Sequence, residues 1–212
     1  MDPVTGLSKR QLVAVALLIP LGIAASTIAT FSSERGDPVC PEGRSEGCSI
    51  SEAGEPVVIG VIADLDSDTS FGEELASATR GRAILGHDLR VDLFDAGCDV
   101  REASAAARDT TDDPPDYPPA ALVLVSLCSE AAVAPLQIVQ DEGIPGVAYG
   151  DSAEVVTPLE EHLVIEETEF TADLTDRLTN ALSEVAVRDE QRVLIPLTEL
   201  REALITGGLR EA

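Results

Sequence analysis

Two cysteines stand where the rim of a pocket would form. Cys98 and Cys128 each follow an apolar run, LRVDLFD at 89–95 and ALVLVSL at 121–127. If both runs are strands of one open parallel sheet, their C-terminal ends lie side by side at the edge where ligands bind. One disulfide across the two loops would then fix the rim of a pocket.

The other two cysteines, Cys40 and Cys48, lie in the segment CPEGRSEGC. Four cysteines in an exported chain fit two disulfides, and three pairings are possible. We expect Cys40–Cys48, because this pair most simply closes its own loop, and then Cys98–Cys128. Free buried thiols are the alternative. Zinc is not expected, because neither pair has C-x-x-C spacing and the two histidines stand alone.

No set of residues in the sequence is typical of an enzyme. A nucleophile with its base, paired acids, a G-x-S-x-G turn and a phosphate loop with its lysine are all missing. Asp64, Asp66 and Asp68 resemble the start of a calcium loop, but Thr69 and Leu75 stand where that loop needs Gly and Glu. We therefore expect no catalytic activity, no metal and no cofactor.

The charge balance limits the partners that the chain can have. The 212 residues include 39 acidic and 14 basic ones, with a net charge of −25. This argues against DNA, RNA or anionic lipid as a partner, because each of these needs a basic surface. Aromatic residues make up only 3% and tryptophan is absent, so aliphatic side chains must form the core. Buried strands of a parallel sheet have this composition.

An uncharged and largely apolar run covers residues 11–31. It is long enough to cross a bilayer as a helix, and Lys9 and Arg10 place residues 1–10 in the cytoplasm. We expect a single-pass anchor in the cell membrane, with the folded domain extracytoplasmic. A cleaved signal peptide, which would leave a secreted or periplasmic protein, is the alternative. Residues 32–55 are rich in Ser, Glu, Gly and Pro and are expected to form an irregular stalk with the Cys40–Cys48 loop.

From Pro56 onward the pattern alternates between strands and helices. Strands are expected at 57–65, 89–95, 121–127, 144–150, 162–167 and 192–197. Helices are expected at 71–85, 100–109, 130–142, 171–186 and 198–212. This alternation predicts an α/β fold with a doubly wound parallel sheet. The main lobe would cover 56–170, and 171–212 would start a second lobe or close the first with a helix, a strand and a helix.

Several segments, taken in order, resemble one family. They are VVIGVIADL at 57–65, FGEELASATRGRAIL at 71–85, D-x-x-C-D at 95–99, L-C-S at 127–129, DEGIP at 141–145 and G-x-S at 150–152. Over roughly residues 56–200 the chain resembles the substrate-binding proteins of branched-chain amino-acid ABC transporters, the Leu/Ile/Val-binding type. The resemblance implies a type I periplasmic-binding-protein fold, in which two lobes close over the ligand. This chain would supply the first lobe and enter the second at about Thr171.

The resemblance also implies a ligand-binding set. Ser129 matches the serine that holds the ligand, and Asp151 and Ser152 match the later loop that holds its carboxylate and ammonium groups. Phe71 matches an aromatic residue that lines the pocket. A serine hydroxyl at a helix N-terminus is chemically suited to a carboxylate. Asp151 and the acids of DLDSDTS at 64–70 favour a cationic or differently held ligand. Each of these residues could equally be a cap, a turn or a core residue.

Two functions follow from these observations. We expect an extracytoplasmic solute-binding module for a small amino-acid-like ligand, with an ABC-transporter permease or another membrane protein complex as partner. The alternative is a membrane-anchored interaction protein whose lobe has lost ligand binding. In that case the helix faces of 71–85 and 100–109 would mediate dimerisation or partner docking.

Overall fold

The fold is described from a computed structural model of the chain. It defines residue 40 and residues 47–65, 69–111, 119–128, 130–150, 163–165 and 171–211, which all belong to one compact unit. None of the helices within these ranges is long and apolar enough to cross a membrane. The predicted membrane segment at 11–31 lies outside the described residues, as do residues 1–10.

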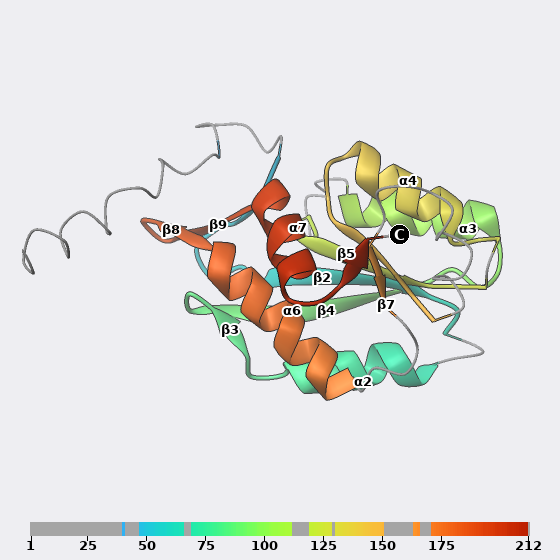
Figure 1. The fold of residues 1–212 in the computed structure, drawn as a ribbon, viewed down its shortest axis with the longest axis horizontal. Coiled ribbons are helices and arrows are strands. Elements are labelled where there is room, and N and C mark those ends of the chain that lie inside the picture. Colours follow the sequence, from blue (N-terminus) through green and yellow to red (C-terminus); the bar gives the residue numbers. More distant parts are fainter. Residues whose placement is uncertain are drawn as a thin grey trace, which may run out of the picture. The chain divides into compact units, whose positions relative to one another are not determined.

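A seven-stranded, mostly parallel sheet forms the centre of this unit (Figure 1). Its order is β10-β7-β6-β5-β2-β4-β3. The five parallel strands are β2 (Val57–Ala63), β4 (His87–Asp95), β5 (Leu122–Ser126), β6 (Gly146–Tyr149) and β7 (Leu163–Ile165). The edge strands β3 (Ala83–Ile84) and β10 (Arg210–Glu211) pair antiparallel. The predicted α/β sheet is thus present, with two antiparallel edges that the sequence did not indicate.

Strand β2 lies at the middle of the sheet and is buried along its whole length. Val57, Ile59 and Val61 pack into the apolar cluster on one face, and Val58 and Ile62 pack into the cluster on the other. Because successive side chains of a strand point to opposite faces, a strand buried on both faces needs a continuous apolar sequence. This is why VVIGVIA lacks the alternation of an exposed strand.

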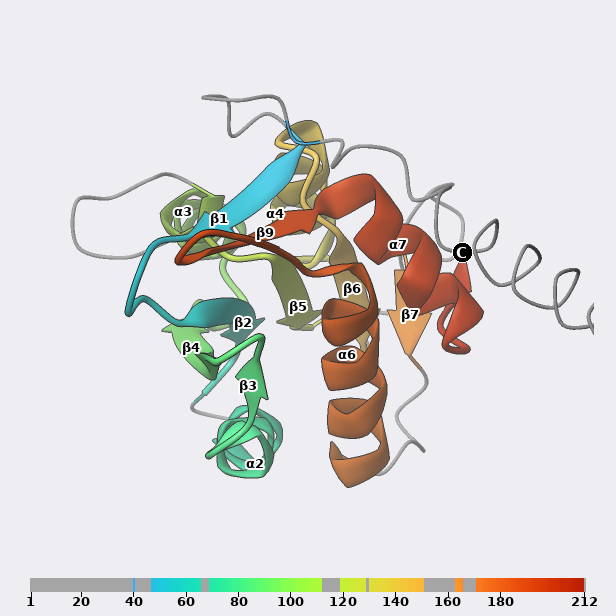
Figure 2. The same cartoon turned by 90° about the vertical axis from the view of Figure 1, so that its left-hand side faces the viewer.

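Helices cover both faces of the sheet (Figure 2). The helices on one face are α2 (Thr69–Thr79), α6 (Thr171–Val185) and α7 (Leu197–Thr206); those on the other are α3 (Val100–Thr111) and α4 (Val133–Asp141). The chain passes from β2 through α2 to β4, and then through α3 to β5 on the opposite side of β2. The strand order therefore reverses at β2, as in a doubly wound fold.

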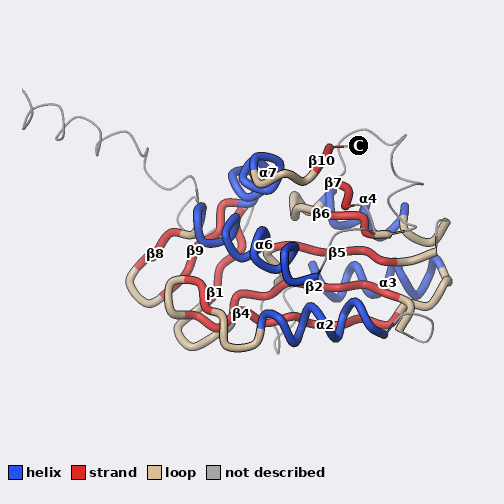
Figure 3. The backbone as a smooth tube through the Cα atoms, turned by 60° about the horizontal axis from the view of Figure 1, so that its bottom comes forward, coloured by secondary structure: helices blue, strands red, loops and turns tan. Residues whose placement is uncertain are grey.

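A separate three-stranded antiparallel sheet lies at one end of the main sheet (Figure 3). It consists of β1 (Cys48–Ser51), β9 (Arg192–Pro196) and β8 (Val187–Asp189), with β9 in the middle. The expectation of irregular structure throughout 32–55 is wrong at 48–51, where β1 pairs with β9. The partner strand comes about 140 residues later, so the short segment CSIS carries no local signal of its pairing.

Two helix ends also differ from the sequence expectation. Helix α2 stops at Thr79 and not near Leu85, because Gly81 takes a left-handed conformation with φ 80° and the chain then turns into β3. Gly86, which directly follows the expected helix, lies in the turn between β3 and β4. At the other end of the chain, α7 stops at Thr206 and residues 210–211 form β10 beside β7.

Candidate functional site

The candidate site is the edge of the main sheet where the parallel strands end. Ala63, the last residue of β2, is in register with Asp95 at the end of β4 and with Ser126 at the end of β5. The loops that follow these three strands therefore start at the same level. Since the strand order reverses at β2, this edge is the switch point at which open α/β sheets bind ligands.

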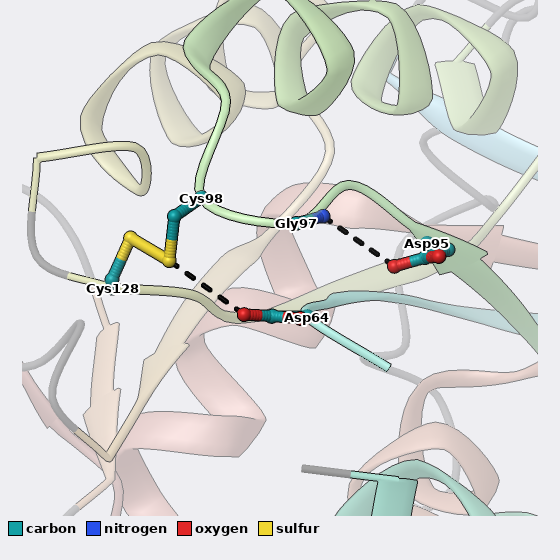
Figure 4. Close-up of a disulfide and its surroundings, with 5 residues drawn as sticks. All are labelled: Asp64, Asp95, Gly97, Cys98 and Cys128. Atoms are coloured by element: carbon teal, nitrogen blue, oxygen red, sulfur yellow. Dashed lines mark hydrogen bonds between the residues drawn. A yellow bond between two sulfur atoms is a disulfide. The ribbon is translucent and has the colours of Figure 1, made fainter. Parts of the chain in front are cut away.

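The disulfide Cys98–Cys128 connects the loops after β4 and β5 (Figure 4). These two strands are not neighbours, because β2 lies between them. Strands two places apart in a sheet are separated by about 9–10 Å, yet the Cα atoms of the two cysteines are 5.7 Å apart. Both loops therefore lean toward each other, and the disulfide passes over the end of β2. The sequence predicted this pairing, but not that a strand lies beneath it.

Asp64, the first residue after β2, lies next to the disulfide. Its Oδ2 is 3.7 Å from Cys98 Sγ. A disulfide sulfur carries no proton to donate, so this is a contact and not a conventional hydrogen bond. The contact places a carboxylate beside the bridge at the switch point.

Asp95 joins the loop after β2 to the loop after β4. Its Oδ1 accepts hydrogen bonds from the backbone N–H of Leu65 at 3.2 Å and of Gly97 at 3.4 Å. The backbone N–H of Ala96 also donates to the carbonyl of Ala63 at 3.0 Å. Three successive loops are thus linked in series: Asp95 joins the first to the second, and the disulfide joins the second to the third. We call the loops at 64–65, 96–99 and 127–128 the rim.

Asp99 caps the helix that leaves the rim. Its Oδ1 accepts hydrogen bonds from the backbone N–H groups of Glu102 at 3.1 Å and Arg101 at 2.8 Å. These two bonds lower the pKa of the Asp99 carboxyl, because they stabilise its charged form. The first turn of α3 therefore uses its own carboxylate to satisfy its N–H groups. Two N–H groups at the start of α3 therefore already have their hydrogen-bond partner within the chain.

Helix α4 begins later than the sequence suggested. It starts at Val133, its N-cap is Ala132, and no side chain caps it. The expectation of a helix that begins at residue 130 is therefore wrong as to where the helix starts. The sequence could not settle this position because a serine followed by Glu130 and two alanines is itself a typical helix start.

A stacked aromatic pair lies below the same edge. The rings of Phe71, in the first turns of α2, and Tyr149, the last residue of β6, have centroids 3.8 Å apart and are inclined by 14°. Phe71 is 4% exposed and Tyr149 is 9% exposed. Both belong to the apolar core between the main sheet and helices α2, α6 and α7. Phe71 was expected to line a pocket, and in this structure it packs against Tyr149. Tyr149 was not among the residues predicted from the sequence, although its place directly before the G-x-S at 150–152 was a usable signal.

The other predicted ligand residues, Ser129, Asp151 and Ser152, lie outside the described residues. Their roles stay predictions. Among the residues that are described, no group of three or more His, Cys, Asp or Glu side chains could hold a metal ion.

A cavity of about 640 Å³ lies at the opposite end of β2 and β4. Its walls come from the turn before β2, the end of α2 and the first half of β4. Phe71, the one predicted ligand residue that the structure describes, does not line it.

We compared the chain with known proteins. No protein-family model matches the sequence, and no curated protein matches it. Among solved structures, a leucine-binding protein from Thermotoga maritima is similar at 19% identity and a TM-score of 0.35, over 43% of this chain and 27% of that one. An ABC-transporter substrate-binding protein from Desulfitobacterium hafniense in complex with Leu is similar at 15% identity and a TM-score of 0.43, over 72% of this chain and 47% of that one. A further structure of a substrate-binding protein from that organism gives 18% identity, a TM-score of 0.43 and the same coverage. The chain spans less than half the length of each of these proteins.

Proposed function

We propose that this chain is a solute-binding module whose ligand sits at the rim. The observation that carries the proposal is the disulfide Cys98–Cys128, which crosses the end of β2 where the strand order reverses. A disulfide that served stability alone could join any two neighbouring loops. This one, together with Asp95, fixes the loops of the sheet edge that open α/β folds use for ligands.

A fixed rim favours binding because loops that are already ordered lose less conformational freedom when a ligand arrives. The backbone N–H groups of Leu65 and Gly97 are held by Asp95, and the start of α3 is held by Asp99. Loops that are held in this way can present their remaining polar groups in one arrangement. Precise positioning of this kind is what a selective site for a small molecule requires.

We infer that the ligand is amino-acid-like and carries a cationic group. The acids Asp64, Asp95 and Asp99 lie on or next to the rim, and the family resemblance adds Asp151 to the ligand set. Carboxylates attract an ammonium group and repel a free carboxylate. A ligand with more than one cationic group therefore suits this edge better than a neutral-side-chain amino acid.

The proposed setting is outside the cell. Two disulfides, Cys40–Cys48 and Cys98–Cys128, form readily in an oxidising compartment, and the uncharged run at 11–31 would anchor the domain to the membrane. A transporter permease is the partner that such a module would serve.

The test is a thermal-shift screen of the full chain, followed by calorimetric titration of any compound that shifts it. The panel contains the common L-amino acids, ornithine, and simple carboxylates without an amine. We expect lysine, arginine or ornithine to raise Tm, because a ligand that binds only the folded state stabilises it. A matched pair of variants places the ligand: Cys98→Ser/Cys128→Ser should weaken binding, and Cys40→Ser/Cys48→Ser should leave it unchanged.

No shift from any compound at millimolar concentration, with the chain folded, would contradict the proposal. If native mass measurement then gave a stable oligomer or complex, the interaction-protein alternative would replace it.

A further inference from the structure

His87, the first residue of β4, holds three distant segments together. Its Nδ1 lies 2.8 Å from the carbonyl oxygen of Glu55, in the turn before β2. Its Nε2 lies 3.1 Å from the carbonyl oxygen of Gln191, in the turn between β8 and β9. These partners are 32 and 104 residues away in the sequence. One ring therefore connects the main sheet to the small antiparallel sheet.

The chemistry of these two contacts favours one protonation state. A backbone carbonyl oxygen can only accept a hydrogen bond, and a neutral imidazole has one N–H group. In the neutral form one ring nitrogen would point its lone pair at a carbonyl oxygen. The imidazolium ion donates from both nitrogens and satisfies both contacts. We propose that His87 is a pH-responsive clasp, which as a cation ties both turns to β4 and on losing a proton releases one of them.

The charged groups around the clasp do not decide its state by themselves. Those carried by the turn before β2, the segment from the end of α2 to β3, the first four residues of β4 and the β8–β9 hairpin are Glu52, Glu55, Arg80, Arg82, Asp88, Arg90, Arg188, Asp189, Glu190 and Arg192. Acids and arginines are equal in number in this set. Several are already engaged: Arg82 with Asp176 at 2.6 Å, and the Glu55 carboxylate with the backbone N–H of Glu52 at 3.0 Å. The clasp therefore rests on hydrogen-bond geometry.

A second link, between the β8–β9 hairpin and the β3–β4 hairpin, does not depend on pH. The guanidinium of Arg188, on β8, donates to the carbonyl oxygen of Leu85 in the β3–β4 turn. A guanidinium stays charged across the working pH range. Loss of the His87 clasp would therefore loosen the β8–β9 turn without detaching the small sheet. Because Glu55 and His87 also line the cavity of about 640 Å³, the clasp fixes part of its wall.

The sign of the pH effect follows from the state that folding prefers. If the folded chain binds the His87 proton more tightly than the unfolded chain, stability from the clasp is present at low pH and is lost as pH rises. The net charge of this acidic chain also changes with pH, so the effect of the clasp must be isolated by difference. The chain offers a matched control, because its second histidine is His162.

The experiment compares the full-length wild type with His87→Gln and His162→Gln by thermal unfolding between pH 5.5 and 8.5. We expect the Tm difference between wild type and His87→Gln to be about 2–4 °C larger at pH 5.5 than at pH 8.5, the size of shift that one hydrogen bond gives in a domain of this length. His162→Gln should follow the wild type. A difference that stays constant with pH would overturn the proposal.

A second measurement does not depend on how well His87→Gln folds. His162→Gln leaves His87 as the single imidazole, whose two ring nitrogens can be followed by long-range ¹H–¹⁵N NMR. At pH 5.5 we expect both ring N–H groups of His87 to be protected from exchange with solvent, because each is held in a hydrogen bond to a carbonyl oxygen. Ring N–H groups that exchange at this pH as fast as those of a free imidazole would overturn the proposal.

Discussion

At the scale of single residues, Gly60 shows how tightly helix α3 is packed on the main sheet. A Cβ added at Gly60 would lie 3.0 Å from Thr110 Cγ2 and 3.5 Å from Ala120 Cβ. Gly60 is in the middle of β2, which is buried along its whole length. Glycine is needed here because α3 and the segment before β5 approach the backbone too closely for a side chain.

We expect Gly60→Ala to lower the free energy of unfolding by about 1–3 kcal/mol, the usual cost of overpacking a core. Thr110→Ser should relieve this cost in the double variant, because it removes the Cγ2 methyl group. It also keeps the hydroxyl that donates to the carbonyl of Ala107 at 2.7 Å. Urea unfolding of the two single variants and the double variant measures the coupling. If Gly60→Ala cost the same in the wild-type background and in the Thr110→Ser background, this account of the packing would be contradicted.

Leu85 is a residue whose backbone conformation does not suit its side chain. It has φ 49°, Gly86 after it has φ 93°, and together they form the two-residue turn between β3 and β4. Turns of this kind favour Asn-Gly, because asparagine tolerates the left-handed region and leucine does not. The Leu85 side chain is also 37% exposed, so the core loses little without it.

We therefore expect Leu85→Asn to raise the free energy of unfolding by up to about 1 kcal/mol, because the left-handed strain is relieved. The carbonyl that accepts from Arg188 belongs to the backbone and is kept. Gly86→Ala is the opposite control and should destabilise, since alanine would be forced to the same positive φ. Chemical denaturation of both variants is the measurement. A destabilised Leu85→Asn would mean that the exposed leucine makes contacts that outweigh its backbone strain.

At the scale of the elements, the sequence predicted those that carry a strong local pattern. Strands β2, β5 and β6 are short apolar runs bounded by turn residues, and they were placed to within two residues. Helices α3 and α6 have a clear polar face and were placed equally well. The strands that were not predicted, β1, β3, β8 and β10, have two to four residues each. Their pairing depends on partners elsewhere in the fold, so no local window contains the signal.

Some features of the candidate site could likewise be predicted from the sequence, and others could not. The pairing of Cys98 with Cys128 could be reached from the number and places of the cysteines. That the bridge crosses β2 could not, because strand order is set by the packing of the whole sheet. The partner of Phe71 was equally out of reach. Tyr149 stacks on it only because α2 and β6 are brought to the same face.

The two disulfides should contribute differently to stability. Cys98–Cys128 spans a sequence separation of 30 residues, and Cys40–Cys48 one of 8. A longer closed loop restricts the unfolded chain more, so we expect Cys98→Ser/Cys128→Ser to cost about 2–4 kcal/mol and Cys40→Ser/Cys48→Ser to cost less. Urea unfolding under oxidising conditions measures both. The same experiment in excess reductant is the control, because all variants should then converge toward the reduced wild type. Equal stability of Cys98→Ser/Cys128→Ser and the oxidised wild type would remove this bridge from the account of the rim.

At the scale of the whole molecule, the net charge of −25 sets how the fold responds to its solvent. A compact chain with this charge is destabilised by its own repulsion, because unfolding moves like charges apart. The ion pairs among the described residues offset little of this repulsion. The pairs Arg82–Asp176, Arg90–Asp92 and Arg192–Asp189 lie at least partly in solvent, where such pairs contribute about 0–1 kcal/mol.

We therefore expect salt to stabilise the protein at neutral pH. Raising NaCl from about 0.01 M to 1 M shortens the screening length from about 30 Å to about 3 Å, which removes most of the repulsion between surface carboxylates. Tm at pH 7 should rise across this range. The control is the same series near pH 4.1, the pI calculated from the sequence, where the net charge is close to zero and the rise should largely disappear. A Tm at pH 7 that does not depend on NaCl would mean that the acidic side chains lie far enough apart, or are paired well enough, for repulsion not to limit the fold. A rise of equal size at both pH values would instead assign the effect to the salting-out of apolar surface.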